Sequence, residues 1–134
     1  MKILCEAVIP VLAILLAFTS WRDWKRMVPP LLLGLGWFLL WQNLDRAFRI
    51  WWPNDFSSHS AVAIVVGCSL AARGARWAAV TIALWLAYAW MMRELGYHTV
   101  VDMVTTLGIM LPFMIGVLWL NGRRGIARPT PSQG

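Results

Sequence analysis

The chain has 134 residues, of which 60% are hydrophobic and 13% are charged, whereas soluble domains average about 25% charged residues. So few polar side chains cannot coat a water-soluble globule, and the hydrophobic residues come in blocks, which favours a single integral membrane domain. The net charge is +6, but the basic residues lie at the block ends and no basic run is interleaved with aromatic residues. This pattern indicates membrane topology and excludes nucleic-acid binding.

The hydrophobic blocks predict an all-α bundle of about five transmembrane helices. The first segment covers residues 3–19 and is interpreted as a spanning helix rather than a signal peptide, because Glu6 interrupts it and no clear cleavage site follows. A basic linker, residues 20–26, precedes the second segment. We expect this segment to begin at Val28, since Pro29 and Pro30 suit a helix start, and to run to Arg49.

The other three segments are expected over residues 58–72, 77–92 and 98–120, with Asn121 and Gly122 stopping the last one. The third is short for a full span, because a crossing helix needs about 20 apolar residues. These boundaries predict one transmembrane domain, residues 1–122. A basic, proline-containing tail, residues 123–134, is expected to be disordered.

Basic residues are distributed unequally between the two sides that five spans would create. One side would hold Arg22, Lys25, Arg26, Arg73, Arg76, Arg123, Arg124 and Arg128; the other would hold Lys2, Arg46, Arg49 and Arg93. The positive-inside rule places the first set and the C-terminus in the cytoplasm. The expected setting is a bacterial inner membrane, with the second set facing outward.

Ionisable side chains gather at the helix ends on the predicted outer side. They are Asp45, Arg46, Arg49, His59, Arg93, His98 and Asp102, and the polar Gln42 lies with them. Ionisable groups at membrane depth are costly and tend to be functional. Asp102 follows His98 by four residues, so its carboxylate can hold the imidazole Nδ1 proton and leave Nε2 free as a nucleophile.

The same end offers groups suited to a phosphate. The arginines can form bidentate bonds to it, and Ser57, Ser58 and the free N–H groups of a helix start make a second anion cradle. His59 is placed to protonate a leaving oxygen. This set supports phosphoryl transfer without a metal or cofactor.

These residues resemble the type 2 phosphatidic acid phosphatase (PAP2) superfamily. Residues 56–60 are similar to its second signature, Pro-Ser-Gly-His, and Arg93 with the run from His98 to Asp102 is similar to its third. Gln42 with Arg49 resembles its first signature. In the first signature Gln42 stands where the family has a lysine, and Arg46 is placed to supply the missing charge. In the third signature only four residues separate Arg93 from His98, one fewer than usual. Phe56 and the run from His98 to Asp102 also resemble the sphingomyelin-synthase branch.

The resemblance implies an activity and residue roles. The chain would hydrolyse a lipid phosphate or pyrophosphate, with His98 as the nucleophile that forms a phosphohistidine, Asp102 as its orienting partner and His59 as the general acid. Arg49 and Arg93 would bind phosphate, Ser57 through its hydroxyl and backbone, and Ser58 through its backbone N–H. The substrate would enter a polar pocket at the outer face.

Two other functions stay open, as does the formation of homo-oligomers. A lipid headgroup transferase would use the same residues, and a non-catalytic membrane protein would retain only the fold. Thr105 and Thr106 are expected to bond backbone or neighbouring helices. The ten tryptophans are expected to be interface anchors. Close-packing points are expected at Gly34, Gly36, Gly67 and Gly108.

Overall fold

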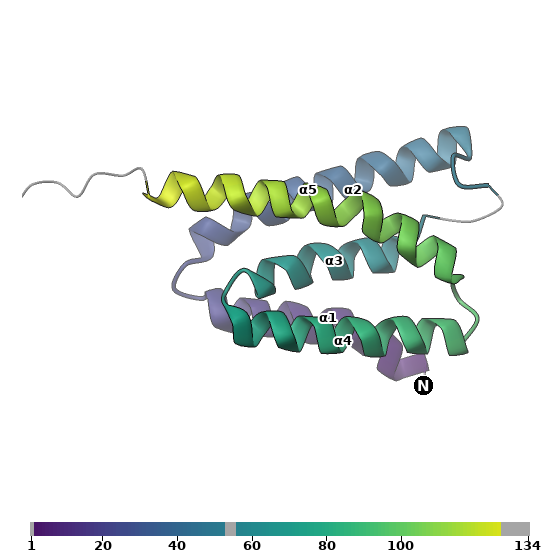
Figure 1. The fold of residues 1–134 in the computed structure, drawn as a ribbon, viewed down its shortest axis with the longest axis horizontal. Coiled ribbons are helices and arrows are strands. Elements are labelled where there is room, and N and C mark those ends of the chain that lie inside the picture. Colours follow the sequence, from purple (N-terminus) through teal and green to yellow (C-terminus); the bar gives the residue numbers. More distant parts are fainter. Residues whose placement is uncertain (1, 53–55, 127–134) are drawn as a thin grey trace, which may run out of the picture.

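The structure is a computed structural model that describes residues 2–52 and 56–126. This part of the chain forms five α-helices and no strands: α1 (Lys2–Ser20), α2 (Trp24–Phe48), α3 (Ser58–Ala71), α4 (Ala75–Glu94) and α5 (Val100–Ile126). The five-helix, all-α prediction is therefore confirmed. Figure 1 shows the helices running side by side, with α3 between the pair α2 and α5 and the pair α1 and α4.

The shortest helix, α3, lies at the centre of the bundle. It packs against each of the other four helices, and ten of its 14 residues are buried. At a rise of about 1.5 Å per residue, α3 is only about 21 Å long, against about 38 Å for α2 and 41 Å for α5. Because its neighbours surround it, α3 does not have to match the thickness of a bilayer by itself.

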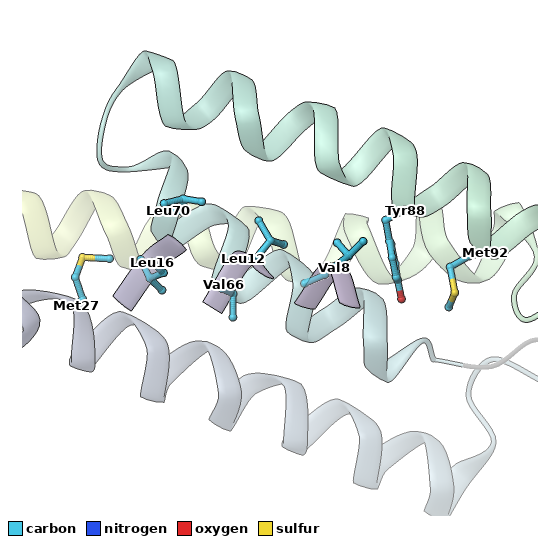
Figure 2. Packing of buried hydrophobic residues seen from close by; sticks show 9 residues of the cluster. Val8, Leu12, Leu16, Met27, Val66, Leu70, Tyr88 and Met92 are labelled. Atoms are coloured by element: carbon cyan, nitrogen blue, oxygen red, sulfur yellow. The ribbon is translucent and has the colours of Figure 1, made fainter. Parts of the chain in front are cut away.

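Two hydrophobic clusters lie on opposite faces of α3. The first joins α3 to α1 and α4 through Val8, Leu12, Leu16, Val66, Leu70, Tyr88 and Met92. Figure 2 shows the three α1 residues of this cluster in a row beside the α3 residues. The second joins α3 to α2 and α5 through Phe38, Ile64, Val65, Met110 and Met114. The central helix thus connects both halves of the bundle.

The helix connections divide the bundle into two ends (Figure 1). We call the end formed by residues 49–52, 56–57 and 95–99 the histidine end, and the end formed by residues 20–24, 72–74 and 121–126 the basic end. At the basic end, the Arg73 guanidinium donates to the Thr19 carbonyl over 2.7 Å and pairs with the Asp23 carboxylate at 3.3 Å. This contact ties the α3–α4 connection to the α1–α2 connection.

The second helix begins four residues earlier than the sequence indicated, at Trp24 rather than Val28, so the expected linker is largely helical. Pro29 and Pro30 therefore lie inside the helix. Proline has no N–H, so Pro30 cannot donate to the carbonyl of Arg26 four residues before it. The side-chain amide of Asn121 donates to that carbonyl instead, over 2.9 Å. A partner on α5 thus compensates for the lost helical hydrogen bond.

The expected stop at Asn121 and Gly122 is also wrong, because α5 continues to Ile126. Its last turns are held against neighbouring groups: Asn121 bonds to Arg26, and the Arg123 guanidinium lies 3.6 Å from the centroid of the Trp119 ring. These contacts outweigh the weak helix propensity of one glycine. The predicted tail at residues 127–134 lies outside the described residues.

Three helices are long and apolar enough to cross a membrane, namely α2, α4 and residues 100–123 of α5. Many of their large hydrophobic side chains face outward, as Leu86 at 68% exposure illustrates. An outward-facing surface of this kind is unfavourable in water but suits lipid. The described bundle is therefore compatible with a membrane protein.

Two of the four expected close-packing glycines are confirmed. A Cβ atom on Gly67 would meet the Trp85 ring at 2.6 Å, and one on Gly34 would meet Met114 Sδ at 2.6 Å. A Cβ on Gly36 or Gly108 would meet nothing within 4 Å, so that expectation is wrong for this pair. The two confirmed glycines let α3 approach α4 and let α2 approach α3 and α5.

The tryptophans serve two purposes rather than one. Five are largely exposed, as expected of interface anchors: Trp21, Trp24, Trp52, Trp90 and Trp119. Trp37 instead stacks on Phe113 with ring centroids 4.6 Å apart, and Trp85 donates its indole N–H to the Ala63 carbonyl over 3.1 Å. Tryptophans of this second group pack the helices against one another.

Candidate functional site

The histidine end contains all nine residues predicted to form the site. Gln42, Arg46 and Arg49 come from the last turns of α2 and its cap, and Arg93 from the last turn of α4. The two serines and His59 lie at the start of α3, whereas His98 and Asp102 lie at the start of α5. These helix termini share one end of the bundle (Figure 1). The four helix ends that were expected to converge therefore lie at the same end.

His98 and Asp102 form the best-defined pair of the site. The imidazole Nδ1 of His98 lies 3.7 Å from Oδ2 of Asp102, and both side chains are largely buried, at 18% and 7% exposure. The distance is longer than a direct hydrogen bond, which is about 2.7–3.2 Å. His98 precedes α5 by two residues instead of lying on it, so the pair joins a loop residue to the first turn of the helix.

The Asp102 carboxylate also caps α5. Its Oδ2 accepts the backbone N–H of Thr99 over 2.8 Å, while the Thr99 hydroxyl accepts the backbone N–H of Asp102 over 3.2 Å. This reciprocal pair is a capping box, which satisfies donors at the start of a helix. The negative charge also lies where the helix dipole favours it. Asp102 therefore has a structural role in addition to its contact with His98.

A buried polar cluster connects α5 with the start of α3. Thr106 donates its hydroxyl to the Asp102 carbonyl over 2.7 Å and accepts the backbone N–H of Ser57 over 3.2 Å. The Ser57 hydroxyl in turn contacts that of Ser60 at 2.8 Å and accepts its backbone N–H at 3.3 Å. Thr105 bonds only to backbone carbonyls of its own helix. The expectation that both threonines bond backbone or neighbouring helices is confirmed.

This cluster fixes the relative heights of the two helix starts. Ser57 is level with Thr106, and Thr106 lies seven residues beyond Thr99, which is about 10 Å along the helix. The start of α3 therefore lies deeper in the bundle than the start of α5. His98 therefore lies outward of His59, and no hydrogen bond or ion pair joins these two described imidazoles.

The other basic groups of the predicted site face outward. His59, Arg46, Arg49 and Arg93 are exposed, and Gln42 and Ser58 are half-buried. Arg49 caps α2 in the left-handed conformation, with φ of 50°, and its guanidinium lies 5.5 Å from the centroid of the Trp52 ring. The exposed arginines are accessible to a ligand.

Asp45 was not predicted to have a role and organises the connection after α2. Its two carboxylate oxygens accept the backbone N–H groups of Trp51, over 3.1 Å, and Phe56, over 3.4 Å. The Phe56 ring is buried and contacts the rings of Phe38 and Trp51. Asp45 thus holds Trp51 and Phe56, the residue before Ser57, at the last turn of α2. An acidic residue in the last turn of a helix opposes its dipole, a signal that marks such a residue in the sequence.

Thr99 and Ser60 were also missed. The spacing of Thr99 and Asp102 is that of a capping box and is visible in the sequence. Ser60 follows Ser57 by three residues, the spacing at which an N-cap hydroxyl meets the N3 position. The bond between Ser57 and Thr106 joins residues 49 positions apart, and no local pattern indicates it.

An apolar cavity of about 200 Å³ lies between α3, α4 and α5, directly inward of the histidine end. Its lining includes Ser60, Ala89 and Met103, with Leu86 and Leu107 further along. Ala89 is one helical turn from Arg93, and Met103 is one turn from Thr99. The cavity is therefore apolar inside and has charged residues beyond its outer end, an arrangement suited to an amphiphile.

Among the described residues, no three His, Cys, Asp or Glu side chains come close enough to hold a metal ion. Comparison with known proteins found no match: no protein-family model, curated protein or solved structure is similar to this chain.

Proposed function

We propose that this protein is an integral membrane lipid phosphatase that acts at its histidine end and follows PAP2 chemistry. The observation that carries the proposal is the largely buried pair of His98 and Asp102, which lies 3.7 Å apart at a helix start. Arg93 lies five residues before His98, and an apolar cavity lies directly inward. An imidazole paired with a carboxylate, a guanidinium and a space for an alkyl chain suit a lipid phosphate.

In the proposed reaction, Nε2 of His98 attacks the phosphorus atom and the bond from phosphorus to the lipid oxygen breaks. His59 gives its proton to that leaving oxygen. Water then attacks the phosphohistidine while His59 takes a proton from it, which releases phosphate and restores both imidazoles. Asp102 holds the Nδ1–H of His98, and its separation of 3.7 Å needs to close by less than about 1 Å, as catalytic contacts often do when substrate binds.

Phosphate binding would rest mainly on exposed groups. Arg93 and Arg49 can turn toward a phosphate and form charge-assisted bonds. Arg46 and Gln42 lie about one and two turns back from Arg49 along α2. The N–H of Ser57 already donates to Thr106, so the anion cradle at the start of α3 would use the N–H of Ser58 instead. The leaving oxygen is bonded to the phosphorus that Nε2 of His98 attacks, so His59, exposed and deeper in the bundle, must approach the same phosphate from its inner side.

The test is phosphate release by the purified protein in detergent, with and without EDTA, from a panel that includes phosphatidic acid and undecaprenyl pyrophosphate. We expect release that EDTA does not reduce and vanadate inhibits. His98→Ala and His59→Ala should abolish it without unfolding the protein, whereas Arg76→Gln at the basic end should have no effect. Phosphate release at the wild-type rate by His98→Ala would eliminate this mechanism.

A headgroup transferase would use the same phosphohistidine but pass the group to a second lipid. Adding an acceptor lipid to the same assay distinguishes the two. New phospholipid without free phosphate would favour the transferase, and free phosphate that is unaffected by the acceptor would favour the phosphatase.

One observation favours a non-catalytic membrane protein. The Asp102 carboxylate is bonded to the Thr99 backbone in a capping box, which by itself accounts for an aspartate at this position. If the protein has no catalytic activity, a mutational scan should find His59 and His98 freely replaceable while Thr99 and Asp102 remain sensitive through stability. Loss of function at both histidines, with stability retained, would argue for the enzyme.

The proposed orientation places the basic end in the cytoplasm of a bacterial inner membrane and the histidine end outside. Glu94→Cys and Ala72→Cys put a thiol at opposite ends of the bundle, and both positions are exposed. In a Cys5→Ser background, a membrane-impermeant maleimide applied to intact cells should label the first variant only. Labelling of the second variant alone would reverse the orientation.

A further inference from the structure

A second, larger cavity opens between α1 and α2 at the basic end, far from the histidine end. Its volume is about 630 Å³, within the range of about 300–1,000 Å³ that is usual for small-molecule sites. The two helices make few direct contacts with each other, because α3 lies between them for most of their length (Figure 1). The space between them is thus an open groove with α3 as its floor.

The groove is built from matching faces of two helices. On α1 the lining residues recur at Ala13, Leu16, Ala17 and Ser20, and the α2 lining from Trp24 to Leu31 has the same spacing. This spacing puts each set on one side of its helix. Each set extends over about 10 Å, which is most of the roughly 15 Å hydrocarbon depth of one leaflet. The groove therefore has the length and the lining needed for the upper part of an acyl chain.

A buried hydroxyl lies at the end of the groove nearest the loop. Ser20 is 4% exposed and lines the groove, and its Oγ makes no hydrogen bond in the described structure. Buried hydroxyl groups are normally bonded, so an unpartnered one indicates a missing partner. An ester or phosphate oxygen at the head of an acyl chain would be placed at this depth and would accept this hydrogen bond.

Positive charge surrounds the same end of the groove. The Lys25 ammonium lies 5.8 Å from the centroid of the Trp24 ring, which lines the groove. Arg22 and Arg26 are exposed and adjoin the lining residues Trp21 and Met27 in the sequence. The nearby Asp23 carboxylate is paired with Arg73, so it does not neutralise these three cations. Trp21 and Trp24 are 82% and 57% exposed, as expected of rings at headgroup depth.

We infer that the groove between α1 and α2 binds an anionic phospholipid from the leaflet at the basic end. One acyl chain lies over Leu16 and Val66, Ser20 donates to an oxygen at the head of that chain, and Lys25 with Arg22 contacts the headgroup phosphate. This site is independent of the proposed phosphatase site and lies at the opposite end of the bundle.

The experiment uses the full chain in phosphatidylcholine vesicles that contain a little phosphatidylglycerol with a diazirine on one acyl chain. After illumination, peptide mass spectrometry should find the lipid adduct on residues 13–31. Unlabelled phosphatidylglycerol should compete about fivefold better than phosphatidylcholine, the preference that one basic residue near the surface confers. Adducts spread evenly over all lipid-facing helices, or equal competition by both lipids, would overturn the inference.

Variants separate the groove from the general lipid surface. Ala17→Phe fills the groove without removing a bond and should suppress the adduct, whereas Ala83→Phe on the exposed face of α4 should not. Lys25→Gln should lower labelling about fivefold, and Arg76→Gln, a basic residue of the same end outside the groove, should leave it unchanged. Ser20→Ala should lower lipid labelling about fivefold, which is the usual effect of losing one neutral hydrogen bond.

A second copy of the chain is the competing occupant. If it covers the groove, Ala17→Cys should form a disulfide-linked dimer more readily than the wild-type chain does, and the lipid adduct should be absent from residues 13–31. That combination would overturn the inference. Labelling that Ala17→Phe does not reduce, in a protein whose helix content is unchanged, would overturn it as well.

Discussion

The side-chain amide of Asn121 donates to the backbone carbonyl of Arg26 over 2.9 Å. The two residues are 95 positions apart, near the end of α5 and the start of α2. The carbonyl is available because the residue four positions later is Pro30, which has no N–H to give. One side chain thus repairs a defect in another helix and fixes the contact between the two at the basic end.

A double-mutant cycle tests this relationship. Asn121→Ala should lower the free energy of unfolding by about 1 kcal/mol, because the Arg26 carbonyl loses its donor. In the Pro30→Ala background the same change should cost almost nothing, since the new backbone N–H serves that carbonyl. Unfolding by sodium dodecyl sulfate in mixed micelles measures both values. Equal costs in the two backgrounds would contradict the account.

Thr106 is expected to matter more than its neighbour Thr105. Thr106→Val removes the acceptor of the buried Ser57 N–H and should lower the free energy of unfolding by about 1–2 kcal/mol. Thr105→Val is the matched control, since it loses only bonds to carbonyls within its own helix. The same unfolding assay measures the difference. A control as destabilised as Thr106→Val would show that the link between α3 and α5 contributes little.

Gly67 is expected to tolerate no side chain. Gly67→Ala would place a Cβ 2.6 Å from the Trp85 ring and should cost about 1–3 kcal/mol of stability through overpacking. Gly36→Ala meets nothing within 4 Å and should be neutral or stabilising by up to about 1 kcal/mol, because alanine favours the helix. Thermal unfolding followed by circular dichroism gives the order of the two variants. The opposite order would contradict the close packing of α3 on α4.

Comparison of Thr99→Ala with Asp102→Ala separates capping from catalysis. Both variants break the capping box and should lose about 0.5–2 kcal/mol of stability. Only Asp102→Ala also removes the partner of the His98 imidazole. If the proposed phosphatase mechanism holds, phosphate release by Asp102→Ala should be at least about 100-fold slower than release by Thr99→Ala. Equal rates at equal folded fractions would mean that Asp102 acts as a cap alone.

The order and approximate bounds of the five helices follow from the sequence, because hydrophobic blocks separated by charged residues report helices directly. The errors lie where a distant residue decides. The start of α2 and the continuation of α5 past Gly122 both depend on the bond between Asn121 and Arg26, which are 95 positions apart. No local signal contains this information.

The candidate site shows the same division. The spacing of His98 and Asp102 predicted a carboxylate near an imidazole. In the structure His98 Nδ1 lies 3.7 Å from Asp102 Oδ2. The depth of α3 could not be foreseen, since it depends on the contact between Ser57 and Thr106. That depth sets His59 inward of His98. The chemical roles assigned to these residues stay predictions.

The enclosure of α3 has a consequence for how the protein is made. Two of the four helices that surround α3, namely α4 and α5, follow it in the chain. During synthesis, which proceeds from the N-terminus, Ser57, Ser60 and Ser69 therefore reach the membrane before their final neighbours exist. A ribosome that stalls before residue 100 would leave a short helix with polar groups facing lipid. Such truncated chains should be prime substrates for membrane proteases.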